Sequence, residues 1–204
     1  MWGKSWRFLF FSAGVLILVG GPQHPKGDMA QMLADSAWVP AHSYLLAGFV
    51  AMLLGLVLSA RNPLSARMRL WLRLAIAGTV LQCIEMALHL AAKVDVENLV
   101  AGRPTPVLTT HLFLAVCVYP IFAATVIGLI IAGAREHKLG SWWIAWLGII
   151  GTAGHGLSAP LVVAVKWGPA GILFPFLMGL ALWLVLASVW PVRAGEDLRH
   201  TASA

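Results

Sequence analysis

Six runs of apolar residues, separated by short polar segments, make up most of this chain. Each run is close to the length that crosses the hydrocarbon core of a bilayer as a helix, about 20 residues. The pattern therefore predicts an all-α integral membrane protein, with six transmembrane helices in one bundle and a single domain. The predicted spans are residues 6–21, 41–60, 71–92, 107–134, 142–165 and 171–190.

The first run follows a short basic start, so it also resembles the hydrophobic part of a signal peptide. We expect it to remain as an uncleaved first span. Residues 22–40 and 93–106 form the two longest polar loops, and we expect a short helix near residues 29–33 in the first of them. The tail after residue 190 is polar, and we expect its end to fray.

Composition supports a membrane protein, because 60% of the 204 residues are hydrophobic and 11% are charged, against about 25% charged residues in soluble chains. The net charge of +6 does not indicate a nucleic-acid partner, since the basic residues lie in short loops rather than on one basic face. The cysteines, Cys83 and Cys117, lie within apolar runs. We expect them to be small buried hydrophobic side chains rather than a redox pair.

The basic residues also indicate the orientation of the chain in the membrane. Six spans put both termini on one side, and cytoplasmic termini would place ten Lys or Arg residues inside and four outside. This is the positive-inside distribution. We therefore expect a multi-pass protein of a cell membrane, such as a bacterial inner membrane. The four basic residues expected outside are Lys26, Lys93, Arg103 and Lys166.

Ionisable residues inside the spans are the main functional signal, because such groups are costly in a bilayer. Glu85 and His89 lie one turn apart on one face of the third span. His42, His111 and His155 lie in the second, fourth and fifth spans. At 1.5 Å per residue, His89 and His111 lie roughly 5 Å below the outer boundary, and Glu85 roughly 10 Å below it. His155 is deepest, at roughly 15 Å, so all of these residues lie in the outer half.

Simpler explanations exist for several of these residues. His42 and His111 could be interfacial side chains that contact water and headgroups. Glu85 and His89 could form a charge-assisted pair that satisfies two costly groups. His155 is the clearest marker of a site, because it lies deep in the membrane without a charged neighbour in sequence. The remaining histidines are expected at the surface, although the loop of the first of them covers the site: His24, His137 and His200.

Small residues surround His155 on its predicted helix face, which includes Gly148, Gly151 and Ala159. Small residues let a flat group or a second helix come close to the backbone. Helix packing and a cofactor groove are both consistent with this face. With a histidine at its centre, we favour the groove and include Gly151 among the candidate cofactor contacts.

A haem would use this set of residues well, since it needs one or two axial imidazoles and an apolar slot between facing helices. If spans two to five form a square, His42 with His111, or His89 with His155, would be axial pairs. The arrangement resembles membrane b-type cytochromes over spans two to five, because their histidines also come from four consecutive helices. Those cytochromes hold haems near both membrane faces, whereas the candidate ligands here lie only in the outer half.

Our first functional hypothesis is therefore a haem b protein that works in electron transfer or in a haem-dependent oxidation, with a quinone or a redox protein as its partner. Glu85 would fix the tautomer of His89 or relay protons. The second is a non-haem metal enzyme, since several imidazoles with one carboxylate suit Zn, Cu or Fe. In that enzyme His89, His111 and His155 would bind the ion and Glu85 would act as the base.

A third hypothesis needs no cofactor: a non-catalytic subunit of a larger membrane complex, an oligomer, or a transporter. The sequence leaves open whether the protein is an enzyme. It contains no closely spaced HExxH or HxxxH pair that would mark a helical zinc site.

Overall fold

The computed structural model describes residues 5–190, and this part of the chain is all-helical, without a strand. It confirms the six predicted helical segments that are long and apolar enough to cross a membrane. The predicted tail, with His200, lies outside the described residues. The long helices are α1 (Ser5–Gly20), α3 (Trp38–Ser59), α4 (Ala66–Ala91), α6 (Pro106–Arg135), α7 (Trp142–Ala159) and α8 (Leu177–Val189). The shorter elements are η2 (Gly21–Gln23), α2 (Met29–Ala34), η3 (Ala92–Asp95), α5 (Val96–Val100), η4 (Pro160–Ala164) and η5 (Gly168–Phe176).

Prolines set several of the helix boundaries. Helix α7 ends at Ala159 because the next residue, Pro160, has no backbone N–H to continue the α-helical hydrogen bonds. A π-helical turn, η4, then extends the segment to Ala164. Pro106 stands in the first turn of α6, where the missing N–H costs nothing. Pro175 lies within the 3-10 helix η5 that leads into α8.

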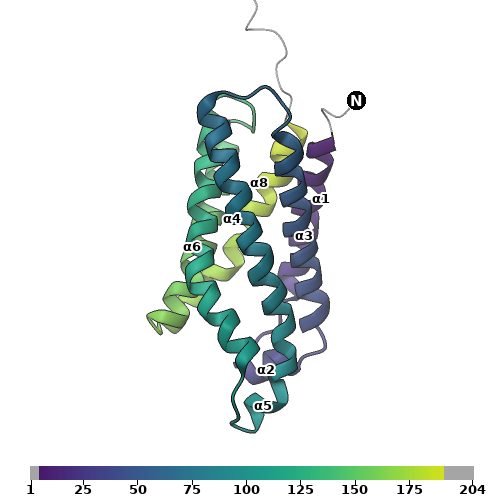
Figure 1. Ribbon diagram of the computed structural model, residues 1–204, viewed down its shortest axis with the longest axis vertical. Helices are drawn as coiled ribbons and strands as arrows, with labels where there is room; N and C mark the ends of the chain where they lie inside the picture. Colours follow the sequence, from purple (N-terminus) through teal and green to yellow (C-terminus); the bar gives the residue numbers. More distant parts are fainter. Residues whose placement is uncertain (1–4, 191–204) are drawn as a thin grey trace, which may run out of the picture.

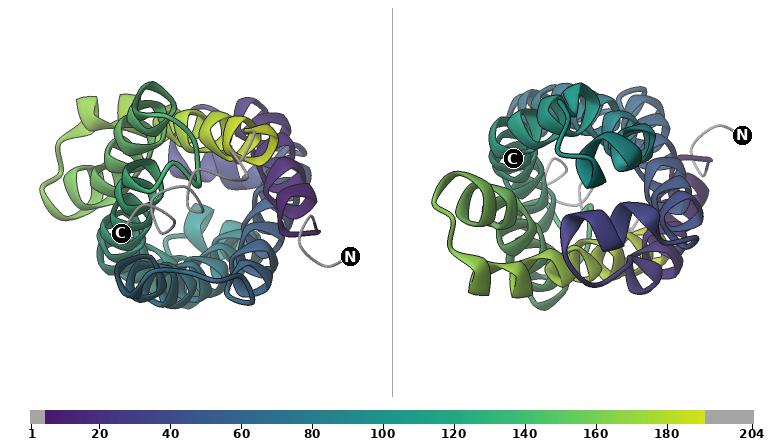
Figure 2. Two further views of the ribbon diagram at one scale, coloured as in Figure 1. Left: turned by 90° about the horizontal axis from the view of Figure 1, so that it is seen from above. Right: turned by 90° about the horizontal axis from the view of Figure 1, so that it is seen from below.

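The long helices follow one another around a closed ring (Figure 2). Each packs against the next in chain order, and α8 returns to pack against α1. The square that we expected from spans two to five is therefore wrong, because α3, α4, α6 and α7 are consecutive members of the ring. Histidines on these helices are neighbours around the ring rather than partners across a diagonal.

Helices α7 and α8 approach each other through glycine. A Cβ atom added to Gly151 would lie 2.5 Å from the backbone nitrogen of Leu180 and 2.6 Å from the Cα atom of Gly179. A Cβ atom at Gly148 would lie 2.7 Å from the Trp183 ring. Helix α8 therefore fills the small-residue face that we expected to accept a cofactor. Gly151 packs against α8, and its role as a cofactor contact stays a prediction from the sequence.

The cysteines do not pair. Both are free; Cys83 is half-buried and Cys117 is exposed on the outer surface of α6. The prediction that both are buried is wrong for Cys117, because its side of α6 faces away from the ring.

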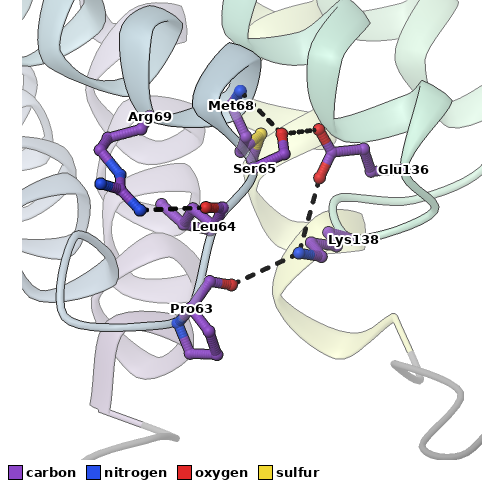
Figure 3. Close-up of polar contacts among 7 residues, drawn as sticks. All are labelled: Pro63, Leu64, Ser65, Met68, Arg69, Glu136 and Lys138. Atoms are coloured by element: carbon purple, nitrogen blue, oxygen red, sulfur yellow. Dashed lines mark hydrogen bonds and ion pairs between the residues drawn. The ribbon is translucent and has the colours of Figure 1, made fainter. Parts of the chain in front are cut away.

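Two loops are tied together at the end of the bundle where α1 begins (Figures 1 and 3). Ser65 caps α4, since its hydroxyl accepts a hydrogen bond of 3.1 Å from the Met68 amide, and it also donates to the Glu136 carboxylate. The Lys138 ammonium lies 3.5 Å from Glu136 and donates to the Pro63 carbonyl at 3.4 Å. These contacts join the α3–α4 loop to the α6–α7 loop.

Two other segments, residues 21–37 and 92–105, lie across the opposite end of the bundle, and together we name them the loop cap (Figures 1 and 2). Asp28 begins α2 through a reciprocal capping box with Gln31. Lys93 donates to the Asp35 carbonyl at 2.8 Å and so joins the two segments. A small apolar core lies beneath them, formed by Leu33, Trp38, Ala92 and Leu108. The loop expected at residues 22–40 is therefore partly buried.

Replacing Gly151 with Ala should destabilise the protein, because the new methyl group would meet the backbone of α8. Overpacking of this kind costs about 1–3 kcal/mol. The measurement is thermal unfolding in detergent. Gly171→Ala is the matched control, since no atom lies within 4 Å of a Cβ at that position. Equal melting temperatures for the two variants would show that the α7–α8 contact is not tight.

Candidate metal centre

Four histidines and one glutamate come together beneath the loop cap. His42 lies in the second turn of α3, Glu85 and His89 lie near the end of α4, and His111 lies in the second turn of α6. His24 comes from the loop cap, just after η2. We refer to the five residues as the histidine cluster: His24, His42, Glu85, His89 and His111.

The imidazole rings of the histidine cluster form a bent row in which each ring touches the next, and the His24 ring also lies 6.1 Å from that of His89. The ring centroids of His24 and His42 are 4.8 Å apart, those of His42 and His89 are 4.2 Å apart, and those of His89 and His111 are 3.9 Å apart. The buried Trp38 ring covers the row, at 4.1 Å from His42 and 5.1 Å from His89. Three successive long helices and one loop thus bring their histidine rings into contact with one another.

Backbone carbonyls orient two of the rings. Nδ1 of His42 donates to the Trp38 carbonyl at 2.6 Å, and Nδ1 of His24 donates to the Pro25 carbonyl at 2.8 Å. Because a carbonyl only accepts, each neutral ring keeps its proton on Nδ1 and its lone pair on Nε2. Metal-binding histidines usually make such a hydrogen bond through the nitrogen that does not bind the ion.

The environment of His24 favours its neutral form. Burial lowers the pKa of His24 below its ordinary value, and this effect outweighs the hydrogen bond to the Pro25 carbonyl, which raises the pKa. A neutral imidazole is the form that binds a metal ion. The expectation that His24 lies at the surface was wrong, because its loop folds inward against His42.

Glu85 is fully buried and its two oxygens have different neighbours. Oε2 accepts a hydrogen bond of 3.0 Å from the Gln82 side chain, which precedes it by one turn on α4. Oε1 lies 2.7 Å from Nδ1 of His111, in a contact that is close but not aligned as a hydrogen bond. The nearest imidazole nitrogen to Glu85 thus belongs to His111 on α6, and the expected pair with His89 on the same helix is not formed as an ion pair.

Several buried atoms of the histidine cluster keep unused bonding capacity. Within residues 5–190, Nε2 of His42 and Nδ1 of His89 have no hydrogen-bond partner. Buried polar atoms are normally satisfied, because leaving one unpaired costs about 1–3 kcal/mol. A bound cation would use these lone pairs.

The donor atoms fall into two groups of three. One group is His24, His42 and His89, and the other is Glu85, His89 and His111. Within each group, one donor atom from each residue lies within 4.8 Å of the others. His89 belongs to both groups. Imidazole and carboxylate are the ligands that zinc, copper and iron use in proteins.

His155 lies apart from the histidine cluster. Its ring stacks on Tyr119 at a centroid distance of 4.4 Å, and it belongs to neither group of donors. Both of its ring nitrogens are buried without a partner among the described residues. We expected His155 to bind a metal ion together with His89 and His111. The structure does not bring these three residues together.

Asp95 positions the end of α6 that carries His111. Its buried carboxylate accepts a hydrogen bond of 2.8 Å from the Leu108 amide, one of the free N–H groups in the first turn of α6. His111 follows one turn later on the same helix. A side chain from the loop cap thus fixes the start of the helix that carries His111.

Comparison with protein-family models, with curated proteins and with solved structures finds no match to this chain. Within residues 5–190, the fold and the site define a class: a ring of six long apolar helices with a histidine–glutamate cluster at one end.

Replacing Asp95 with Ala should loosen the start of α6, because the Leu108 amide would lose its buried acceptor. Loss of a helix cap costs about 0.5–2 kcal/mol. Hydrogen exchange at the amides of residues 107–110 measures the effect, and exchange should accelerate. Glu97→Ala is the control, since Glu97 lies two residues further on and is exposed. An unchanged exchange rate in Asp95→Ala would contradict the capping role.

Proposed function

We propose that this chain is a membrane-embedded metalloprotein that binds a non-haem transition-metal ion in the histidine cluster. One observation carries the proposal: four imidazoles and a fully buried carboxylate meet under the loop cap with unused lone pairs. Two of the rings also hold Nδ1 on a backbone carbonyl, as metal-binding histidines do. This donor set suits zinc, copper or iron.

The ring distances favour an ion over a haem. An axial imidazole directs one ring nitrogen at the haem iron, and two axial imidazoles stand on opposite sides of the haem. In the histidine cluster the imidazoles instead touch one another, at 4.2 Å between His42 and His89 and 3.9 Å between His89 and His111. Haem b, electron transfer and a quinone or redox-protein partner stay predictions from the sequence, with less support than the ion.

The group formed by Glu85, His89 and His111 favours a catalytic ion over a structural one. It offers three protein ligands, two imidazoles and one carboxylate. Structural zinc sites use four protein ligands, whereas catalytic sites keep a position for water or substrate. Two histidines with one carboxylate are also the ligand set of many non-haem iron oxygenases. The proposed activity is metal-dependent chemistry on a small substrate, hydrolytic with zinc and oxidative with iron or copper.

The proposed location is a cell membrane, with the histidine cluster toward the outer side. The loop cap at that end carries three basic residues, Lys26, Lys93 and Arg103. More of them lie at the opposite end, in its loops and the adjoining helix turns: Arg7, Arg61, Arg67, Arg69, Arg73, Arg135 and Lys138. The positive-inside rule then puts the loop cap outside and the termini in the cytoplasm. The loop cap would separate the ion from bulk water on that side.

The test is the metal content of protein purified in detergent, measured by elemental analysis together with its absorption spectrum. Wild-type protein should retain zinc, copper or iron and show no Soret band. His89→Ala and His111→Ala should each bind the ion at least about tenfold more weakly, since loss of a hydrogen-bond partner behind a ligand already costs about 10–100-fold. His137→Asn should bind as wild type does, since His137 is exposed and its φ of 52° suits asparagine.

Circular dichroism of each variant separates loss of the ion from loss of the fold. Wild-type protein without bound metal, but with the helical content of the native state, would overturn the proposal. A Soret band that shifts on reduction with dithionite would establish haem in place of the ion.

A further inference from the structure

We propose that the histidine cluster is a two-ion centre in which His89 bridges the ions. The outer ion would be bound by His24, His42 and His89, and the inner ion by Glu85, His89 and His111. The inference rests on the proposed function, namely that the histidine cluster binds metal. It adds the number of ions, the assignment of each ligand, and a role for His89 that no other residue of the cluster shares.

The first argument is the extent of the donor set. A zinc or copper ion binds imidazole nitrogen at about 2.0–2.1 Å, so two ligands of one ion lie at most about 4.2 Å apart. The five residues of the histidine cluster form two groups of three rather than a single group of five. His24 and His42 share no group with Glu85 and His111, so the donor atoms of the five residues extend beyond one coordination sphere.

The second argument is the position of His89. Its ring lies between His42 on one side and His111 on the other, and it is the residue that the two groups share. An imidazole has two nitrogens on different edges of the ring, so it can bind one ion through each. The Nδ1 protons of His24 and His42 are held by backbone carbonyls, whereas Nδ1 of His89 is buried without a partner. His89 thus keeps a second nitrogen free.

The bridging step is balanced by the loss of one proton. A neutral imidazole holds a proton on one nitrogen and a lone pair on the other, so it binds the first ion without change. Binding of the second ion to the other nitrogen displaces that proton to solvent and leaves an imidazolate. The imidazolate and the Glu85 carboxylate then each offset one positive charge of the two ions, which lowers the cost of holding them in a buried site.

The two proposed ion sites differ in the structural elements that supply their ligands. The inner ligands all lie on α4 and α6, which pack directly against each other. The outer group depends on His24, which belongs to the loop cap. The lone pairs of an imidazole lie in its ring plane, so the stacked His89 and His111 rings must turn about their soft χ2 torsions as the ions bind. The inner ion should bind more tightly, and loss of His24 should release the outer ion alone.

The experiment uses the full-length protein in detergent, stripped of metal and titrated with Cu²⁺. Elemental analysis gives the copper bound per chain, and electron paramagnetic resonance gives the number of uncoupled spins. Wild-type protein should bind two copper ions per chain. Its integrated signal should be well below two spins, with a half-field transition, because an imidazolate couples the two Cu²⁺ ions.

Single substitutions then assign the ligands. His24→Gln should bind one copper ion with the ordinary signal of one spin, and Glu85→Gln should weaken the inner ion while keeping the outer one. His137→Asn serves as the control and should behave as wild type does. His24 lies in a loop that is only partly buried, so His24→Gln should keep its helical circular dichroism.

The copper counts and spin counts test the two-ion centre, the His89 bridge and the ligand assignment separately. One copper ion per chain in both wild type and His24→Gln would overturn the two-ion centre and leave the proposed function standing. Two copper ions that show two full spins would overturn the bridge through His89. Two ions retained in His24→Gln would overturn the assignment of the outer group. No bound copper in wild type would reject the proposed function itself.

Discussion

The burial of Glu85 is the constraint on which the rest of this site depends. A carboxylate inside an apolar helix bundle is costly unless other groups compensate for its charge. Here Gln82 from the same helix donates to one oxygen, and His111 from α6 lies against the other. The position of α6 is in turn fixed by Asp95, which caps its first turn. One buried acid thus connects α4, α6 and the loop cap.

The ring topology explains why the histidines meet. Because consecutive long helices are neighbours, the ends of α3, α4 and α6 under the loop cap lie side by side. His42 near the start of α3, His89 near the end of α4 and His111 near the start of α6 then reach the same depth. The loop after α1 enters at this end as well and adds His24. No helix needs to be broken or unwound to form the histidine cluster.

Hydropathy alone predicted the six helices, since each apolar run has the length of a membrane span, and helix depth alone predicted that His42, His89 and His111 lie at one end. Depth says nothing about direction around the ring. His155 was expected with the others, but it faces Tyr119. The glycines around Gly151 fit a groove or a helix contact equally well, and only the position of α8 distinguishes them. The place of His24 in the cluster depends on the path of the loop after α1. The spacing of apolar residues predicts helices and strands but not the path of a loop. Gln82 could have been found, because it lies one turn before Glu85 on the same face.

X-ray absorption at the edge of the metal that co-purifies with the wild-type protein tests the central claim most directly, because it reports the atoms bound to the ion itself. The account predicts a first shell of nitrogen and oxygen at about 2.0–2.2 Å, together with the outer-shell scattering of at least two imidazole rings. A shell that contains sulfur or the scattering of a porphyrin, or an edge too weak for bound metal, would contradict it.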